Sequence, residues 1–202
     1  MSQIFKSRDN RMRCGWCAAT DDYIHYHDTE WGYPVSDDIR LFEKLCLEGF
    51  QSGLSWRTIL SKRDNFRKAF DGFDFNKIAL FTEEDVKRLL TDQGIVRHRG
   101  KIEATINNAK RAKEMVDEFG SIAAYIWRYE PDANSLGIPQ TASTSEESIT
   151  ISKDLKKRGW KFVGPTTVYA FMQAMGLIND HAEGCEFREK AFEIRKNFKK
   201  PK

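Results

Sequence analysis

The stretch Leu47–Trp56 constrains the fold of this chain most, because it joins the end of one predicted helix to the start of the next through a turn at Gly53. Within it, Glu48 places a carboxylate in a helical stripe that is otherwise apolar. The apolar members of this stripe are Leu41, Phe42, Leu45 and Leu47. A large aromatic residue, Trp56, follows the turn. A glutamate in these surroundings is either a solvated helix residue or an acid placed to bind a ligand.

The composition indicates a soluble globular protein. Of the 202 residues, 40% are hydrophobic and 12% aromatic, which is enough for a core and confines expected disorder to tails and loops. No apolar run approaches the roughly 18 residues of a membrane span, and the first residues lack the apolar segment of a signal peptide. We therefore expect a cytoplasmic monomer without membrane contact. In a reducing compartment, the four cysteines favour thiols or a metal site over disulfides.

The chain divides by charge into three parts. We expect residues 1–12 to be a flexible basic leader, residues 13–187 a single domain of two helical lobes, and residues 188–202 a basic tail. The net charge of +3 permits a polyanionic partner without requiring one. Runs of basic residues are usually solvated helix faces, but two of them, at Arg97–Lys101 and Lys153–Lys161, adjoin glycine turns.

Helical periodicity and capping residues predict an all-α fold. Expected helix starts are Ser36 or Asp37, Ser55, Thr82 (with Asp85 in a capping box), His98, Ser121, Ser145 and Pro165. The helix from Ser55 should continue towards Phe70, and a long amphipathic helix should span His98–Phe119. Loops are expected over Arg13–Pro34 and over Glu130–Thr144, the latter being the most mobile part. No segment shows the alternation of a strand.

Two short motifs near opposite ends of the chain each have the spacing of half a zinc site. Spacing alone nominates Cys14, Cys17, His181 and Cys185, and a second choice replaces Cys17 with His27. For either pair alone, unliganded thiols and a surface histidine are a competitive interpretation. A closed set of four protein ligands leaves no open position for catalysis. We therefore expect a structural zinc that clips the two ends of the chain together.

Residues 153–176 have the pattern of a helix, a basic hairpin between two glycines, and a second helix. Glycines let the backbone approach a ligand closely, and the N–H groups at a helix start bind anions. Such a segment could hold a DNA phosphate without reading sequence, although a plain helical hairpin with a solvated surface fits the pattern equally well. The candidate DNA contacts are Gly159, Lys161, Gly164, Thr166 and Thr167.

The chain resembles the bacterial DNA-3-methyladenine glycosylase I family, the constitutive members of the helix-hairpin-helix DNA glycosylases. The resemblance runs from about Arg13 to Cys185 and rests on many motifs in one order. They include Arg13-Cys-Gly-Trp16, Tyr26-His-Asp28, Glu30-Trp-Gly32, Leu47-Glu-Gly49, Gly53-Leu-Ser-Trp56, Arg97-His-Arg-Gly-Lys-Ile102, Leu155-Lys-Lys-Arg-Gly159, Lys161-Phe-Val-Gly164, Phe171-Met-Gln-Ala174 and Asn179-Asp-His181.

This resemblance implies a helix-hairpin-helix glycosylase fold with a zinc clip that joins the N- and C-terminal segments. The implied activity is excision of 3-methyladenine from double-stranded DNA, with the free base as product. The implied zinc ligands are Cys14, His27, His181 and Cys185, so that Cys17 becomes a neighbour. The implied base pocket consists of Glu48 with Trp16, Tyr26 and Trp56, and Tyr23 lies close to that set. The implied wedge that fills the gap in the DNA falls on Gly53 and Leu54.

The chemistry of such a pocket suits a cationic base. An enzyme must flip a base out of the duplex to reach it, and Leu54 would fill the vacated stack. Aromatic faces stack on an electron-poor purine with a cation–π contribution. Glu48 would accept from the exocyclic amine and offset the positive charge of the ring. We expect recognition and electrostatic stabilisation to be its first role, and a general-base role towards water is the weaker alternative.

Two further residue types bear on the reaction class. No motif positions a lysine as a Schiff-base nucleophile, so we predict a monofunctional hydrolase that leaves the strand uncut. Asp180 is a candidate acid aimed at the sugar, but a helix-end or zinc-adjacent role is the favoured interpretation. The main alternative function is a zinc-stabilised helical DNA-binding module without catalysis. A zinc hydrolase is the second alternative.

Overall fold

The structure, a computed structural model, describes residues 3–132 and 135–202. Its described part is predominantly helical. The strands are β1 (Ile4–Lys6) and β2 (Met12–Cys14), and the short 3-10 helices are η1 (Gly15–Ala19), η2 (Asp71–Phe73) and η3 (Trp127–Tyr129). The α-helices are α1 (Asp21–Thr29), α2 (Asp38–Gln51), α3 (Trp56–Ser61), α4 (Arg63–Ala69), α5 (Phe75–Ile78), α6 (Glu83–Thr91), α7 (Arg99–Phe119), α8 (Ile122–Ile126), α9 (Glu146–Lys157), α10 (Pro165–Ala174) and α11 (Glu186–Asn197).

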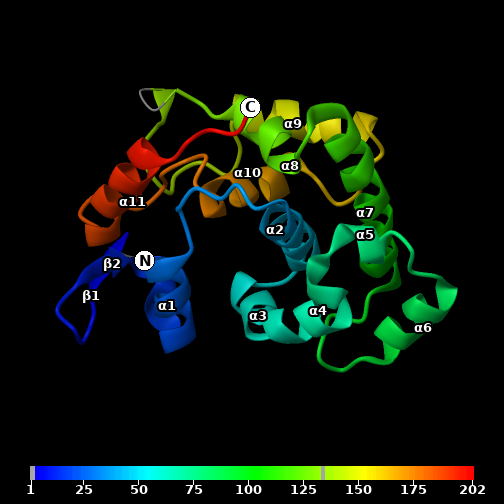
Figure 1. The fold of residues 1–202 in the computed structure, drawn as a ribbon. Helices are drawn as coiled ribbons and strands as arrows, with labels where there is room; N and C mark the ends of the chain where they lie inside the picture. The colour runs from blue at the N-terminus through cyan, green and yellow to red at the C-terminus, as the bar shows by residue number, and fades with distance from the viewer. Residues whose placement is uncertain (1–2, 133–134) are drawn as a thin grey trace.

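Helix α2 runs through the middle of the molecule and packs against α7, α8 and α10 (Figure 1). The helices α4 to α7 lie on one side of it, and the β1–β2 hairpin, α1 and α11 lie on the other. Chain segments from both ends of the sequence therefore meet on one side of α2. Among the described residues, none of the helices has the length and apolar character needed to cross a membrane.

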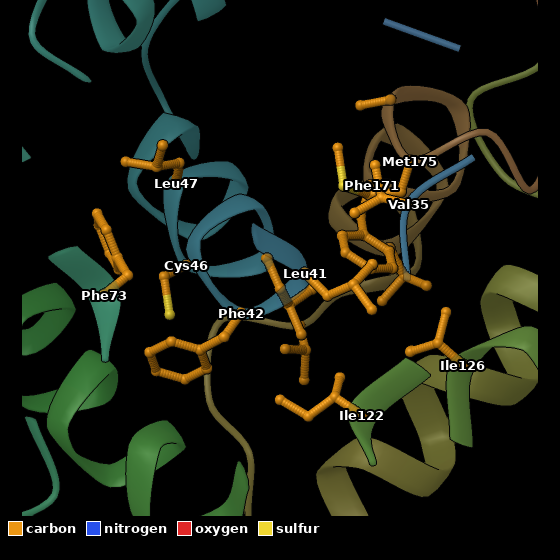
Figure 2. Packing of buried hydrophobic residues seen from close by; sticks show 14 of the residues in the cluster. Val35, Leu41, Phe42, Cys46, Leu47, Phe73, Ile122, Ile126, Phe171 and Met175 are labelled. Carbon is orange, nitrogen blue, oxygen red and sulfur yellow. The ribbon is translucent and has the colours of Figure 1, made fainter. Parts of the chain in front are cut away.

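The apolar face of α2 forms the centre of the core. Leu41, Phe42, Cys46 and Leu47 are almost fully buried, and Figure 2 shows them pointing towards side chains from several other elements. Burial of each large apolar side chain stabilises the fold by about 1.5–3 kcal/mol. Cys46 is thus a core residue.

Lys101 of α7 fixes the end of α2. Its Nζ donates to the carbonyl oxygens of Phe50, at 2.8 Å, and Ser52, at 2.5 Å. These carbonyl groups lie where a helix end leaves acceptors without intrahelical partners. The turn that follows is therefore held against α7, and Gly53 adopts a left-handed φ of 80° in it. The helix–turn–helix reading of Leu47–Trp56 is confirmed.

The predicted helix starts agree with the structure at nearly every position. The side chains that cap helices by accepting a backbone N–H bond include Asp37, Ser55, Thr82, His98, Ser121 and Ser145. Pro165 opens α10, and Asp85 completes the capping box with Thr82. The helix predicted from Ser55 to Phe70 is wrong in one respect, because it breaks at Lys62 into α3 and α4.

The N-terminal predictions need the largest correction. The expected absence of strands is wrong, because β1 and β2 pair antiparallel with Ile4 opposite Cys14. Three-residue strands are too short to show alternation in the sequence. Arg13 holds this hairpin together by ion pairs with Asp9 and Asp28, each at 2.7 Å. Strand β1 and the first residue of β2 fall within the predicted leader, residues 1–12.

Two other segments were assigned to irregular structure but are helical. Helix α1 lies in the predicted loop Arg13–Pro34, and its polar and aromatic residues lack an apolar stripe because they face a cavity and a cysteine–histidine cluster. Helix α11 occupies much of the predicted tail and buries Phe187 and Ala191. Residues 1–2 of the leader and 133–134 of the loop Glu130–Thr144 lie outside the described residues.

Candidate functional site

A cavity of about 270 Å³ opens beside α2. This volume lies just below the roughly 300–1,000 Å³ of typical small-molecule pockets. It therefore suits one small flat molecule. Its walls come from four separate parts of the sequence: the η1–α1 region, α2 with the start of α3, the loop before α9, and α10. The lining residues are Trp16, Tyr23, Tyr26, Trp31, Lys44, Glu48, Gln51, Trp56, Gln140, Ala142, Ala170 and Gln173.

All five residues predicted for the base pocket line this cavity. Glu48 lies near the end of α2 and is only 5% exposed. This burial excludes the interpretation of Glu48 as a solvated helix residue. Trp56, at the start of α3, lies with its ring centroid 5.5 Å from that of Tyr26. Trp16 packs edge-on against Tyr23 at 5.0 Å.

The hydroxyl groups of both tyrosines are neutral at physiological pH. Burial, followed by the nearby charge of Glu48, raises the pKa of Tyr23 to about 12. The same two causes, in the same order, hold the pKa of Tyr26 well above its ordinary value. Each phenol therefore keeps its proton, and each can both donate and accept a hydrogen bond.

Lys44 is the most important residue of the cavity that the sequence reasoning missed. Its Nζ lies 2.7 Å from Oε1 of Glu48, one helical turn away, and it donates to the Tyr26 hydroxyl at 2.8 Å. The same atom lies 3.2 Å from the centroid of the Trp56 ring. Burial lowers the pKa of Lys44, while the charge of Glu48 opposes that shift. The i,i+4 spacing of a Lys and a Glu was the available signal.

The other unpredicted lining residues reach the cavity from distant segments. Gln140 and Gln173 are held there by Asp180, whose carboxylate accepts from the Gln140 backbone N–H at 3.0 Å and from Gln173 Nε2 at 2.6 Å. Burial raises the pKa of Asp180. Asp180 itself does not line the cavity. It positions part of the cavity wall, a role that neither sequence interpretation of this residue included.

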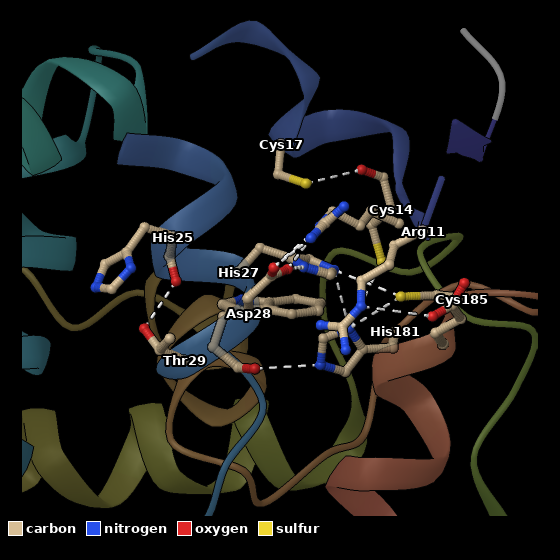
Figure 3. Close-up of polar contacts among 12 residues, drawn as sticks. Arg11, Cys14, Cys17, His25, His27, Asp28, Thr29, His181 and Cys185 are labelled. Atoms are coloured by element: carbon tan, nitrogen blue, oxygen red, sulfur yellow. Dashed lines mark hydrogen bonds and ion pairs between the residues drawn. The ribbon is translucent and has the colours of Figure 1, made fainter. Parts of the chain in front are cut away.

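A second group of functional side chains gathers next to η1 and α1. The ligand-type atoms of Cys14, His27, His181 and Cys185 all lie within 4.8 Å of one another, and all four residues are buried. Figure 3 shows these side chains converging from β2, α1 and the segment before α11. The distances between neighbouring atoms run from 3.2 Å, between the two imidazole nitrogens, to 3.7 Å. Tetrahedral zinc with Cys and His ligands requires edges of about 3.3–3.8 Å.

The hydrogen bonds of the two histidines test whether a cation fits this cluster. Nδ1 of His27 bonds to the carboxylate of Asp28 at 2.8 Å, and Nε2 of His181 bonds to the carbonyl of Trp31 at 3.1 Å. Because both partners are acceptors, these two nitrogens carry the protons in neutral rings. The remaining nitrogens then direct their lone pairs at each other across 3.2 Å. A bound cation would satisfy both lone pairs, so the residues fit a metal ion.

Cys17 does not belong to this cluster. Its Sγ donates to the carbonyl oxygen of Cys14 at 3.2 Å, and the ligand-type atoms that gather are those of the set implied by the family resemblance. The first set of ligands nominated from spacing, which included Cys17 in place of His27, is therefore not the set that the structure brings together. The short spacing between Cys14 and Cys17 suggested that both are ligands. In the structure, helix α1 instead brings His27 into the cluster.

The turn between α9 and α10 presents the candidate DNA contacts. Asn108 of α7 holds this turn by accepting from the backbone N–H of Lys161 at 2.9 Å and by donating to its carbonyl at 2.9 Å. The side chains of Lys161 and Thr166 are exposed, Thr167 is half-buried, and Gly159 has a left-handed φ of 84°.

Gly164 caps α10 with an ordinary φ of −64°. A Cβ at this position would meet no protein atom within 4 Å. Neither the backbone conformation nor the packing of the protein therefore requires glycine here. At the other turn, Gly53 needs its left-handed φ, and Leu54 beside it is 43% exposed.

Comparisons with known proteins agree with this arrangement. The methyladenine glycosylase family model matches residues 16–189. DNA-3-methyladenine glycosylase 1 of Escherichia coli (strain K12) is 49% identical over 177 residues, which cover 86% of this chain and 95% of the relative. The DNA-3-methyladenine glycosylase of Haemophilus influenzae is 45% identical, with 86% of this chain and 96% of the relative covered.

Solved structures give the same result. The 3-methyladenine DNA glycosylase I of Staphylococcus aureus superposes with a TM-score of 0.80 at 35% identity, covering 87% of this chain and 96% of that one. This chain likewise combines a helical fold with an aromatic cavity that contains a buried acid. The chain belongs to the methyladenine glycosylase family. It is therefore an enzyme of the class that acts on N-glycosyl bonds.

Proposed function

We propose that this enzyme removes 3-methyladenine from double-stranded DNA by flipping the nucleotide into the cavity and hydrolysing its N-glycosidic bond, without cutting the strand. The observation that carries the proposal is Glu48, a buried carboxylate among aromatic rings in a cavity large enough for one base. A related structure of 35% sequence identity is described as a complex with 3-methyladenine.

Glu48 and the aromatic side chains contribute the attractive contacts to the methylated purine. Stacking on Trp56 and Tyr26 favours an electron-poor ring, and the carboxylate accepts from its exocyclic amine. When the N-glycosidic bond breaks, its electron pair passes to the base, which thereby loses its positive charge. A water molecule bonds to the sugar carbon and releases a proton. Glu48 also stabilises the positive charge that develops on the sugar.

The DNA contacts proposed here lie on the two exposed turns. The α9–α10 turn forms a helix-hairpin-helix whose open Gly164 and helix N-terminus accommodate a phosphate oxygen. Lys161, Thr166 and Thr167 add charge and hydroxyl donors, and Gly159 shapes the turn. Gly53 and the exposed Leu54 provide the apolar wedge for the gap left by the flipped nucleotide.

A structural zinc ion is part of this proposal. Cys14, His27, His181 and Cys185 would hold it and tie the N-terminal hairpin to the C-terminal segment. The ion supplies a cross-link and no reaction step, because four protein ligands complete its coordination. A zinc hydrolase would need an open coordination position, and the burial of all four residues disfavours one.

Lys44 lines the cavity, although no sequence motif marked it as a Schiff-base nucleophile. The Nζ of Lys44 is nevertheless engaged by the carboxylate of Glu48 and the hydroxyl of Tyr26, whereas a Schiff base requires a free amine. We keep the proposal that the strand remains uncut, and that the enzyme works as a cytoplasmic monomer.

Release of free 3-methyladenine from methylated duplex DNA tests this function. The wild-type enzyme should release the base, and Glu48→Gln should lose at least about 100-fold in rate while it keeps its fold, as expected for removal of a preorganised electrostatic group. The matched control is Glu103→Gln on the exposed face of α7, which should leave release unchanged. A non-catalytic DNA-binding module would release no base and would bind DNA equally well with either substitution.

A further inference from the structure

Lys44 contacts the same groups that the proposed function assigns to the base. Its single Nζ atom lies 2.7 Å from the carboxylate of Glu48, 2.8 Å from the hydroxyl of Tyr26 and 3.2 Å from the ring centroid of Trp56. The amino group of Lys44 thus contacts a carboxylate, a hydroxyl group and an aromatic face at the same time. These are the contacts that attract a cationic purine. A base that enters the cavity must share them or displace the ammonium group.

The surrounding charges leave Glu48 as the principal counter-charge of Lys44. Behind the ammonium group, Glu30 pairs with Arg63 at 2.7 Å and with Arg40 at 3.5 Å. Next to Lys44 in the sequence, Glu43 pairs with Arg67 at 2.8 Å. These acids carry their own basic partners. The cavity therefore contains a Lys–Glu pair where a pocket with only the acid would contain an unpaired carboxylate.

We propose that Lys44 is a specificity-determining residue that makes this cavity select against a fixed positive charge on the base and in favour of the neutral base. The inference rests on the proposed function for the identity of the ligand, a methylated purine. Two positive charges would compete for one carboxylate inside a buried site, where their repulsion is weakly screened. A neutral purine with a ring nitrogen acceptor can instead accept from the ammonium while its amine donates to Glu48.

A preference for the neutral base favours the reaction, because the reaction converts a cationic base into a neutral one. The methylated base is cationic while it is joined to the sugar, and it becomes neutral as the bonding electrons pass to it. An adjacent ammonium group therefore raises the free energy of the bound substrate more than that of a transition state in which the charge has partly left the base. Its removal should tighten substrate binding and slow the chemical step, so that KM and kcat both fall.

Binding of two free purines to the intact enzyme tests the inference without using catalysis. One probe is neutral 3-methyladenine, and the other is the 3,9-dimethyladeninium cation, whose fixed charge imitates the base when it is joined to the sugar. Quenching of tryptophan fluorescence reports binding, because Trp16 and Trp56 line the cavity. The variants are Lys44→Met, which keeps the apolar stem, Lys44→Gln, and the charge-preserving Lys44→Arg. Lys87→Met on the exposed face of α6 is the matched control.

We expect the wild type, Lys44→Arg and Lys87→Met to prefer the neutral probe. In Lys44→Met and Lys44→Gln, the affinity for the cation relative to the neutral base should rise by roughly tenfold or more, as expected when a close like charge is removed. An unchanged affinity ratio in both neutral variants, with folding verified by circular dichroism, would overturn the inference. The proposed function fails separately, if the wild-type enzyme releases no 3-methyladenine from methylated DNA.

Discussion

The Nε2 atom of His27 lies 3.2 Å from the Nδ1 atom of His181. The other nitrogen of each ring is hydrogen-bonded to an acceptor, so two lone pairs face each other inside a buried cluster. Such an arrangement is unfavourable without a cation. It is favourable around zinc, because bonds to acceptors orient the ligating rings and increase their basicity. The stability of the protein should accordingly depend on metal.

We predict that removal of zinc destabilises the fold. A metal held at 1,000 times its Kd contributes about 4 kcal/mol to the free energy of unfolding, so chelation should lower Tm by several degrees. His181→Ala should lose the bound zinc measured by elemental analysis, whereas Cys17→Ser should retain one zinc per chain. Metal-free protein with an unchanged Tm would contradict a structural role for the cluster.

The α9–α10 turn gives a second prediction. Gly164→Ala should fold normally, because φ is −64° and the added Cβ would meet no protein atom within 4 Å. If a phosphate lies against this position, the methyl group will displace it. Loss of one charge-assisted hydrogen bond of about 1.5–3 kcal/mol should weaken binding to undamaged duplex DNA by at least tenfold, as measured by fluorescence anisotropy.

Gly137→Ala is the matched control for this experiment. A Cβ at Gly137 would also meet nothing within 4 Å, but this residue lies in the loop before α9. Its DNA affinity and Tm should equal those of the wild type. Equal affinities of the two alanine variants would argue against a phosphate contact at Gly164.

Local signals in the sequence predicted most of the helices and part of the cavity. Asp37, Ser55 and Thr82 cap their helices as expected, because capping depends on neighbouring residues alone. The short strands and the helix α1 were missed, because contacts with the other end of the chain stabilise them. The backbone N–H of Met12 in β2, for example, donates to the Glu186 carboxylate, 174 positions away.

The cavity residues also divide into those that local sequence could predict and those that depend on distant contacts. Glu48 stood out because it interrupts an apolar stripe, and Lys44 could have been found from its spacing of four residues. Gln140 could not, because it is held at the cavity by hydrogen bonds from its backbone and side chain to Asp180, 40 positions away. Spacing reduced the candidate metal ligands to two sets of four, which differ only in Cys17 or His27. It could not decide between them, because the choice depends on how α1 runs in the folded protein.

The monofunctional mechanism predicts the absence of a covalent intermediate. With borohydride present, an enzyme that cuts the strand through a lysine becomes trapped on the sugar as a reduced Schiff base. Because Lys44 is paired with Glu48, the wild type and Lys44→Met should both give no trapped complex on a gel. A complex formed by the wild type and lost in Lys44→Met would show that Lys44 is a nucleophile and that this proposal is wrong.

The ion pair between Glu30 and Arg63 should make stability depend on pH. Burial raises the pKa of Glu30, but hydrogen bonds from Arg63 and its charge outweigh that effect, so the net pKa lies below its ordinary value of 4.5. A lowered carboxylate pKa contributes stability that is fully present above the unfolded value, near 4.5, and is lost as the pH falls through the folded value.

We therefore predict that Glu30→Gln lowers the free energy of unfolding in urea by about 1–3 kcal/mol at pH 6, and by less at pH 3.5. Loss of metal at acid pH affects both proteins, so the difference between them isolates Glu30. Glu103→Gln, in an exposed pair with Arg99, should change stability little at either pH. A Glu30→Gln difference that stays constant as the pH falls would mean that the Arg63 pair does not hold this carboxylate ionised in the folded protein.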